Sequence, residues 1–220
     1  MKHIRWAFTT ILISAFLFSN AQKTISEGTL IYDIDIQPLK KDAAASSLSG
    51  ATETIYLKGG LSRRDMVSNL GNEKTIHDSK TGNAVILKEY SGQKLMITLT
   101  KPNWDARNKK NDGVVFNPTT ETKEILGHPC IKATATLKDG STMIVYYTKD
   151  LNVINKEYSV LFKNLDGLPM QYEFETRKLK FTYTITKIDL NSLQVAKFEF
   201  PKSGYRVMTY EENQAGKKDL

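Results

Sequence analysis

The stretch from Glu124 to Thr148 constrains the fold more than any other part of the sequence. Its two halves, residues 131–138 and 142–147, each alternate apolar with polar side chains, which indicates strands with one buried face. Between them lies Asp139-Gly140, a pair that tolerates the positive φ angles of a type I′ turn. The sequence therefore predicts a β-hairpin here, and with it an antiparallel sheet.

Further alternating runs extend this pattern along most of the chain. Turns containing glycine, such as Gly59-Gly60 and Ser91-Gly92, separate neighbouring runs. We predict a mostly β fold, a single curved antiparallel sheet in the form of an open half-barrel covered by one or two short helices. The strands expected from these runs are 28–36, 53–58, 61–68, 74–78, 83–90, 94–100, 170–176, 180–188 and 205–210.

Four segments interrupt the strand pattern. Residues 40–52 are rich in Ala and Ser and predict either a short helix or a loop. Residues 101–122 predict a long surface excursion with a short edge strand at 114–117. Residues 156–164 have room for about two helical turns. The polar tail 211–220 is expected to fray.

Residues 1–21 have the pattern of a secretory signal peptide. A short basic start precedes the apolar run Trp6–Phe18, and Ser19-Asn20-Ala21 supplies small residues before a cleavage site at Gln22. An uncleaved membrane anchor is the alternative, but the apolar run is short for a span. We therefore expect a periplasmic or secreted protein with one β-rich domain over residues 22–210, and no transmembrane segment after cleavage.

The charge and the cysteine count limit the partners. The formal net charge is +7, and an exported protein meets little nucleic acid. We therefore expect no nucleic-acid partner, only weak attraction to anionic lipid headgroups or polysaccharide. Cys130 is the one cysteine, so no internal disulfide forms, and its thiol either pairs with a partner or stays buried.

The sequence offers no metal or cofactor motif. After the leader there are two histidines, His77 and His128, and neither has a partner at metal-ligand spacing. Cys130 lies two residues after His128, but no third group is placed to orient that histidine as a base. We therefore predict no metal site, no cofactor and no catalytic residue.

The carboxylate pairs do not indicate hydrolysis either. Asp33 with Asp35, and Glu173 with Glu175, alternate with apolar residues along single strands, as on a solvated outer face. Glycosidase pairs usually include one carboxyl group in an environment that raises its pKa. There is no GxSxG elbow for a serine nucleophile. We therefore predict that the protein is not an enzyme.

Large apolar side chains on the later strands are the candidate ligand-binding residues. Alternate residues of a strand share a face, so a cavity would draw every second residue from several strands. The same residues can fill a core, and the sequence does not separate the two interpretations. The candidates are Met143, Val145, Tyr147, Tyr172, Phe174, Phe181, Tyr183 and Ile185.

Three parts of the chain resemble a secreted domain family of unknown function from Bacteroidetes. They are Glu27–Ile36, Thr122–Thr148, and the closing pair Leu165–Phe174 with Phe198–Glu212. More distantly, the order of the strands and the Phe-x-Phe-Pro pattern resemble the LolA and LppX group of periplasmic lipid and lipoprotein carriers. That resemblance implies an open half-barrel whose concave apolar face is covered by helices.

The resemblance also implies a lid contact and two hypotheses of function. In the carriers an Arg on an early strand helps to hold the lid, and Arg63 or Arg64 stands at that place. The first hypothesis is a module that binds a lipophilic ligand or an acylated protein. The second is a cell-envelope protein that contacts another protein or polysaccharide through a sheet edge or through residues 101–122.

Overall fold

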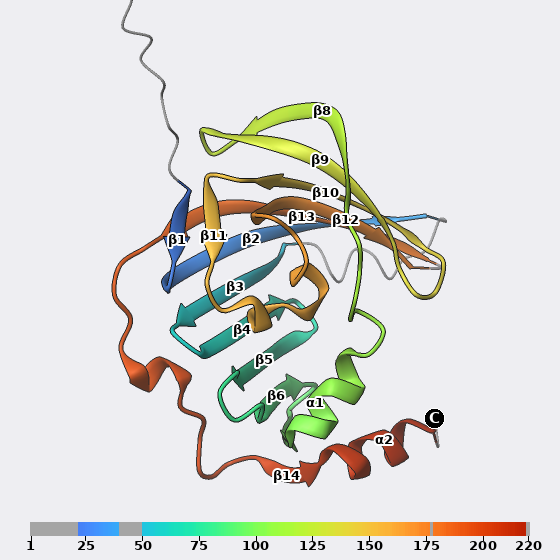
Figure 1. Cartoon of the computed structure of the whole chain (residues 1–220). Coiled ribbons are helices and arrows are strands. Elements are labelled where there is room, and N and C mark those ends of the chain that lie inside the picture. The colour runs from blue at the N-terminus through green and yellow to red at the C-terminus, as the bar shows by residue number, and fades with distance from the viewer. Residues whose placement is uncertain (1–21, 40–49, 177, 219–220) are drawn as a thin grey trace, which may run out of the picture.

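Two antiparallel meanders join into one strongly curved sheet (Figure 1). The protein is seen here in a computed structural model, which describes residues 22–39, 50–176 and 178–218. The strands are β1 (Lys23–Ile25), β2 (Glu27–Pro38), β3 (Ala51–Lys58), β4 (Leu61–Ser68), β5 (Gly71–Asp78), β6 (Ala84–Tyr90), β7 (Gln93–Leu99), β8 (Asn117–Ile125), β9 (His128–Thr136), β10 (Thr142–Thr148), β11 (Leu151–Val153), β12 (Leu168–Glu175), β13 (Leu179–Asp189) and β14 (Arg206–Thr209).

The strand order shows how the meanders meet. The large sheet runs β14-β7-β6-β5-β4-β3-β2-β13-β12-β10-β9-β8 within the described residues. Strands β2 and β13 form the seam, with Thr29 opposite Asp189 at one end and Pro38 opposite Leu179 at the other. The prediction of a mostly β, curved sheet with short helices is therefore confirmed. The structure adds two parallel pairings, β14 with β7 and β1 with β11.

The turn between β9 and β10 differs from the one predicted. Gly140 has a φ of +83°, but Asp139 is not among the described residues with positive φ, so the turn is not type I′. The backbone N–H of Gly140 donates to the carbonyl of Leu137 at 2.9 Å, which makes a three-residue loop with a glycine bulge. Adjacent positive φ angles do occur at Ser91-Gly92 and Leu126-Gly127. The hairpin was predicted correctly and its turn type was not.

Residues 101–122 are not a surface loop. They contain helix α1 (Lys101–Asn108), with Pro102 in its first turn, and the first residues of edge strand β8. Proline suits the start of a helix because its missing N–H would be unpaired there anyway. The ring of Trp104 on α1 stacks on His77 of β5 at 4.3 Å between centroids. This segment is thus tied to the sheet, and the predicted strand at 114–117 is replaced by β8.

The other short helical segments agree with the sequence-based expectation at residues 156–164 and differ from it in the C-terminal tail. Residues 156–164 form two 3-10 turns, η2 (Lys156–Tyr158) and η3 (Val160–Phe162). After β13 the chain crosses the outside of the sheet through η4 (Val195–Phe198) to β14 and α2 (Tyr210–Lys218). The predicted fraying tail is therefore helical up to residue 218. Its start is capped, because Thr209 Oγ1 accepts from the N–H of Glu212 while the Glu212 carboxylate accepts from the N–H of Thr209.

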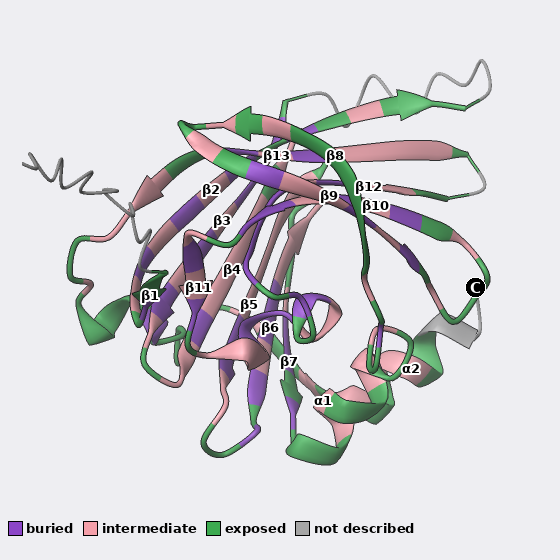
Figure 2. Ribbon diagram, turned by 45° about the horizontal axis from the view of Figure 1, so that its top comes forward, coloured by how far each residue is buried: buried purple, intermediate pink, exposed green. Residues whose placement is uncertain are grey.

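Buried side chains concentrate along the middle strands, as Figure 2 shows by colour. The main core lies on the concave side of the seam and includes Leu30 and Tyr32 of β2 and Val145 of β10. A smaller cluster around Ile86 and Ile97 packs against Trp104. The predicted signal peptide and most of the predicted 40–52 segment lie outside the described residues.

Candidate ligand-binding cavity

The concave face of the sheet encloses a cavity of about 290 Å³. Its floor comes from alternate residues of β3, β4 and β5, because register places Ile55 opposite Arg64 and Arg64 opposite Thr75. Helix α1 and the η2–η3 segment cover it, contributing Trp104 and Phe162 among others. The cavity is therefore bounded by strands of both meanders, by α1 and by the η2–η3 segment.

A buried ion pair lies on the cavity floor. Arg64 Nη1 is 2.8 Å from Glu53 Oε1, and the side chain of Glu53 is fully buried while that of Arg64 is 34% exposed. Burial is the largest influence on the pKa of Arg64 and lowers it, but the carboxylate of Glu53 and the nearby hydroxyls of Tyr172, Tyr183 and Tyr158 together outweigh burial and raise that pKa. A buried pair of this kind costs desolvation energy and is weak evidence for stability. The guanidinium keeps part of its surface free to meet a polar group of a ligand.

Aromatic rings form the wall beside this pair. Tyr172 stacks on Tyr183 with centroids 4.6 Å apart and meets the edge of Phe162 at 4.8 Å. Tyr172 Oη donates to Glu53 Oε2 at 3.3 Å. Burial, reinforced by the charge of Glu53, raises the pKa of Tyr172 well above its usual value. The phenol therefore stays protonated and acts as a hydrogen-bond donor inside an otherwise apolar wall.

A second cavity of about 300 Å³ adjoins the first and shares Asn111, Leu161 and Phe174 with it. It runs toward the β9–β10 hairpin, where Lys110 and Lys138 line it. The two cavities are thus neighbours, with the Glu53–Arg64 pair lining the first and two lysines lining the second.

The predicted ligand-binding residues divide between cavity and core. Tyr172, Phe174 and Tyr183 line the concave cavity, and Met143 lines the adjoining one. Phe181 is half-buried and stacks on Phe174 at 5.0 Å. The remaining predicted residues are fully packed core and line none of the described cavities, namely Val145, Tyr147 and Ile185.

The two candidate lid arginines point to opposite faces of β4. Arg64 lies on the concave side under the η2–η3 segment, as the cavity lining shows. Arg63 lies on the outer side, where it makes two 2.6 Å contacts with Asp65 and donates to the carbonyl of Lys197 at 2.7 Å. Arg64 therefore faces the η2–η3 segment across the cavity, whereas Arg63 contacts the C-terminal segment.

Sequence reasoning missed Glu53, Tyr158 and Trp104 as cavity residues. Glu53 occurs in an alternating run, ATETIYL, in which its position matches that of the apolar residues. Because Glu53 occupies an apolar position of this alternating run, the sequence did contain a signal that its carboxylate is buried. Tyr158 lies on the segment for which about two helical turns were predicted, and Trp104 lies on the predicted surface excursion.

The arrangement of histidine, cysteine and carboxylate side chains bears on metal binding and on nucleophilic chemistry. In the part of the chain that is described, no group of three His, Cys, Asp or Glu side chains is arranged to hold a metal ion. His128 Nδ1 lies 3.1 Å from Asp150, while Cys130 donates to the carbonyl of His128. Burial raises the pKa of the Cys130 thiol to about 11. With its pKa raised in this way, the thiol is a poor nucleophile.

Comparisons with known proteins bear on the fold. No protein-family profile matches the sequence, and no curated protein is significantly similar to it. Among solved structures, PNGF-II is similar with a TM-score of 0.50 and 14% identity, over 87% of this chain and 33% of that one. The chain thus spans about a third of the PNGF-II chain. At this identity the likeness supports the fold alone.

Two further structures are similar at lower scores. MucB matches with a TM-score of 0.43 and 9% identity, over 80% of this chain and 58% of that one. A β-barrel-like protein of a domain of unknown function from Brucella abortus matches with a TM-score of 0.36 and 9% identity, over 77% of this chain and 99% of that one. Over the described residues, no helix has the length and apolar character needed to cross a membrane.

Proposed function

We propose that this protein is a non-enzymatic, exported binding module that holds a lipophilic ligand or an acylated partner in its half-barrel. The observation that carries the proposal is the concave cavity with an aromatic wall and one buried ion pair. Such a lining suits a ligand with an apolar body and a polar carbonyl or ester end.

The size of the cavity indicates how a bound acyl chain would lie in it. About 290 Å³ holds roughly ten water-sized groups at about 30 Å³ each, which is shorter than a full acyl chain. The adjoining cavity past Phe174 provides the remaining length toward Lys138. A long chain therefore threads both spaces, with its polar end at either Arg64 or the lysines.

The alternative, an envelope protein that docks through its sheet edge, has less support. Edge strand β8 is mostly exposed, but it carries Pro118, charged residues and a register shift between Pro118 and Thr122. These features oppose pairing with another strand. Residues 101–108 are occupied by helix α1 and its contact with His77, so they are not a free binding loop.

Ligand retention tests the proposal directly. The full-length protein is exported in a bacterial host and purified without detergent, and organic extracts are analysed by mass spectrometry. We expect a co-purified acyl lipid in amounts comparable to the protein. Met66→Trp fills the cavity and should abolish retention. Val67→Trp is the matched control, because Val67 follows on the same strand, points to the other face and is 46% exposed.

Retention that is equal in both tryptophan variants, or a clean extract from the wild type, contradicts the proposal. The same preparation tests export. Mass spectrometry of the mature N-terminus should find Gln22 as the first residue, and a protein that still carries Trp6–Phe18 contradicts cleavage.

A further inference from the structure

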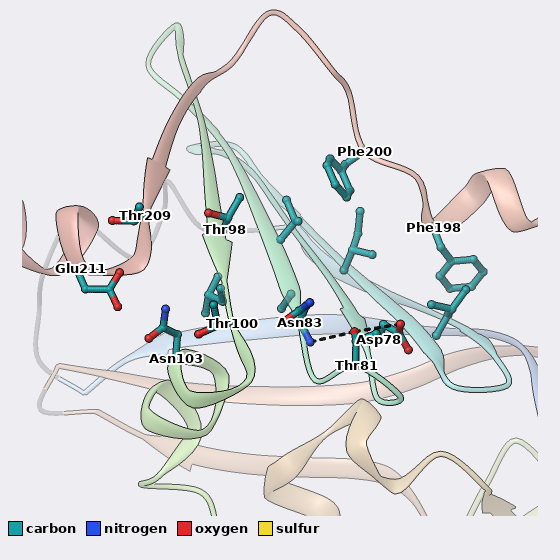
Figure 3. Close-up of a pocket in the computed structure, with 15 residues that line it drawn as sticks. Asp78, Thr81, Asn83, Thr98, Thr100, Asn103, Phe198, Phe200, Thr209 and Glu211 are labelled. Atoms are coloured by element: carbon teal, nitrogen blue, oxygen red, sulfur yellow. Dashed lines mark hydrogen bonds between the residues drawn. The ribbon is translucent and has the colours of Figure 1, made fainter.

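A further cavity lies on the outer face of the sheet, away from the concave site. It measures about 600 Å³ and lies between the ends of β4–β7 and the C-terminal segment that arches over them (Figure 3). Ile76 and Val85 on the sheet side alternate with residues of the concave face, so the sheet itself separates the two spaces. We refer to this space as the outer groove.

The outer groove has an apolar end and a polar end. Phe198 and Phe200 of the C-terminal segment lie at one end, while Asn103, Thr209 and Glu211 lie at the other (Figure 3). Phe200 is 44% exposed, whereas Phe198, which also lines the groove, is buried. A ligand that fits must therefore have an apolar part and a polar part on opposite ends.

The polar end offers neutral hydrogen-bonding groups that are not used by the protein. Among the described residues, the side-chain amides of Asn83 and Asn103 have no hydrogen-bond partner. The hydroxyls of Thr98 and Thr100 line the same space, as does that of Thr209, which already accepts from the N–H of Glu212. Each amide provides both a donor and an acceptor, which matches the hydroxyl groups of a polyol.

The charges of the lining exclude an anionic headgroup. No Lys or Arg is found among the described residues that line the groove, whereas Asp78 and Glu211 are. Asp78 is already occupied, since it accepts from the N–H of Lys80 at 2.9 Å and from Thr81 Oγ1 at 3.1 Å. Glu211 remains as an exposed carboxylate, which repels a fatty-acid carboxylate or a phosphate.

We propose that the outer groove is a second binding site, specific for a neutral glycoside that carries an apolar chain. The chain lies against Phe198, Phe200 and Ile76, and the sugar hydroxyls bond Asn83 and Asn103. About 600 Å³ corresponds to roughly twenty water-sized groups, enough for a sugar ring with a medium-length chain. The proposal does not depend on the function of the concave cavity.

Binding of n-octyl β-glucoside, below its critical micelle concentration, tests the site. NMR titration of the ¹⁵N-labelled protein should show saturable shifts at Thr98 and Asn103. Asn83→Ala and Asn103→Ala should each weaken binding about fivefold, the loss of one net hydrogen bond. Thr98→Trp places a ring in the groove from an exposed strand position and should abolish binding. Gln93→Trp, exposed at the far end of the same strand, is the matched control.

Two probes of the same chain length complete the experiment, the anionic octanoate and the cationic octylammonium. Octanoate should bind at least tenfold more weakly than the glucoside. Octanoate or octylammonium binding as tightly as the glucoside overturns the proposal, as does the absence of saturable glucoside binding. Shifts that map to Tyr172 and Phe174 instead also overturn it. Met66→Trp, which blocks the concave cavity, should leave glucoside binding unchanged, so the two sites fail or succeed separately.

Discussion

Glu53 and Arg64, on neighbouring strands β3 and β4, form an ion pair at 2.8 Å on the concave face of the sheet. Glu53 also accepts from the hydroxyl of Tyr172, which belongs to the other meander. One buried carboxylate therefore connects the two halves of the half-barrel at the cavity floor.

Breaking this pair should destabilise the protein. Arg64→Met leaves the carboxylate of Glu53 buried without its cation, so we expect a loss of about 3 kcal/mol in the free energy of unfolding by urea. The double variant Glu53→Leu with Arg64→Met should recover most of that loss, because no charge is left unpaired. Arg63→Met is the neighbouring control, with an expected cost of about 1 kcal/mol. Equal losses in the Arg64 single and double variants would show that the pair is not the cause.

His77 should make stability depend on pH. Its ring is buried against Trp104, and neither ring nitrogen has a hydrogen-bond partner among the described residues. Burial lowers the pKa of His77 below its usual value of 6.5. Between the lowered pKa and 6.5 the unfolded chain binds more protons, so stability is present above pH 6.5 and is lost as the pH falls through that window.

The measurement compares urea unfolding at pH 7.5 and pH 5. The wild type should lose more stability at pH 5 than His77→Phe, which keeps a stacked ring and cannot be protonated. His128→Gln, at the partly exposed histidine beside Asp150, should behave like the wild type. An unchanged pH dependence in His77→Phe would rule out this histidine as its source.

Glu27 should contribute stability at neutral pH that disappears in acid. Its carboxylate accepts from Lys58 Nζ at 2.5 Å, from Ser192 Oγ at 3.0 Å and from the N–H of Leu193. These bonds, led by that from Lys58, lower the pKa of Glu27 from 4.5 to about 2. The stability is therefore present above pH 4.5 and is lost as the pH falls toward 2. The difference in Tm between the wild type and Glu27→Gln should vanish over that window, and a constant difference down to pH 2 would contradict it.

The Phe181→Ala substitution tests whether this predicted ligand-binding residue belongs to the packed core or to the binding site. Phe181 is half-buried and stacked on Phe174, so we expect a loss of about 2 kcal/mol, less than the 3–5 kcal/mol of a fully buried ring. Lipid retention should fall as well, because Phe174 lines both cavities. Ile185→Ala, in the packed core, should cost as much or more stability without a specific effect on retention in the folded fraction. Full retention by folded Phe181→Ala would remove this ring from the site.

The fold could be predicted where the signals are local. Alternation of apolar and polar residues predicts a strand, and a glycine turn such as Gly59-Gly60 between two such runs predicts a hairpin. The structure confirms both kinds of prediction. Pro102 in the first turn of α1 and the capping box of Thr209 and Glu212 were also local signals. The polar composition around them nevertheless favoured a loop and a frayed tail. The pairing of β2 with β13 joins distant residues, so no local pattern specifies it.

The site was predictable only in part, for the same reason. The period of β12 and β13 places Tyr172, Phe174 and Tyr183 on one face, and these line the cavity. Whether a residue of that face meets a cavity or packed core depends on what covers it, which is decided by η2, η3 and α1. Burial of Glu53 depends on Arg64 across the strand pair, a relationship that a single sequence does not display.

The seam between β2 and β13 has a consequence for the way the chain folds. It pairs residues about 160 positions apart, such as Thr29 and Asp189, while every other antiparallel pairing of the large sheet joins strands closer in the chain. Closing so long a loop carries a large entropic cost and slows folding. Each meander can therefore form early, and the seam joins them late. A chain that ends before β13 would present β2 and β12 as two open edges, ready to pair with other chains and aggregate.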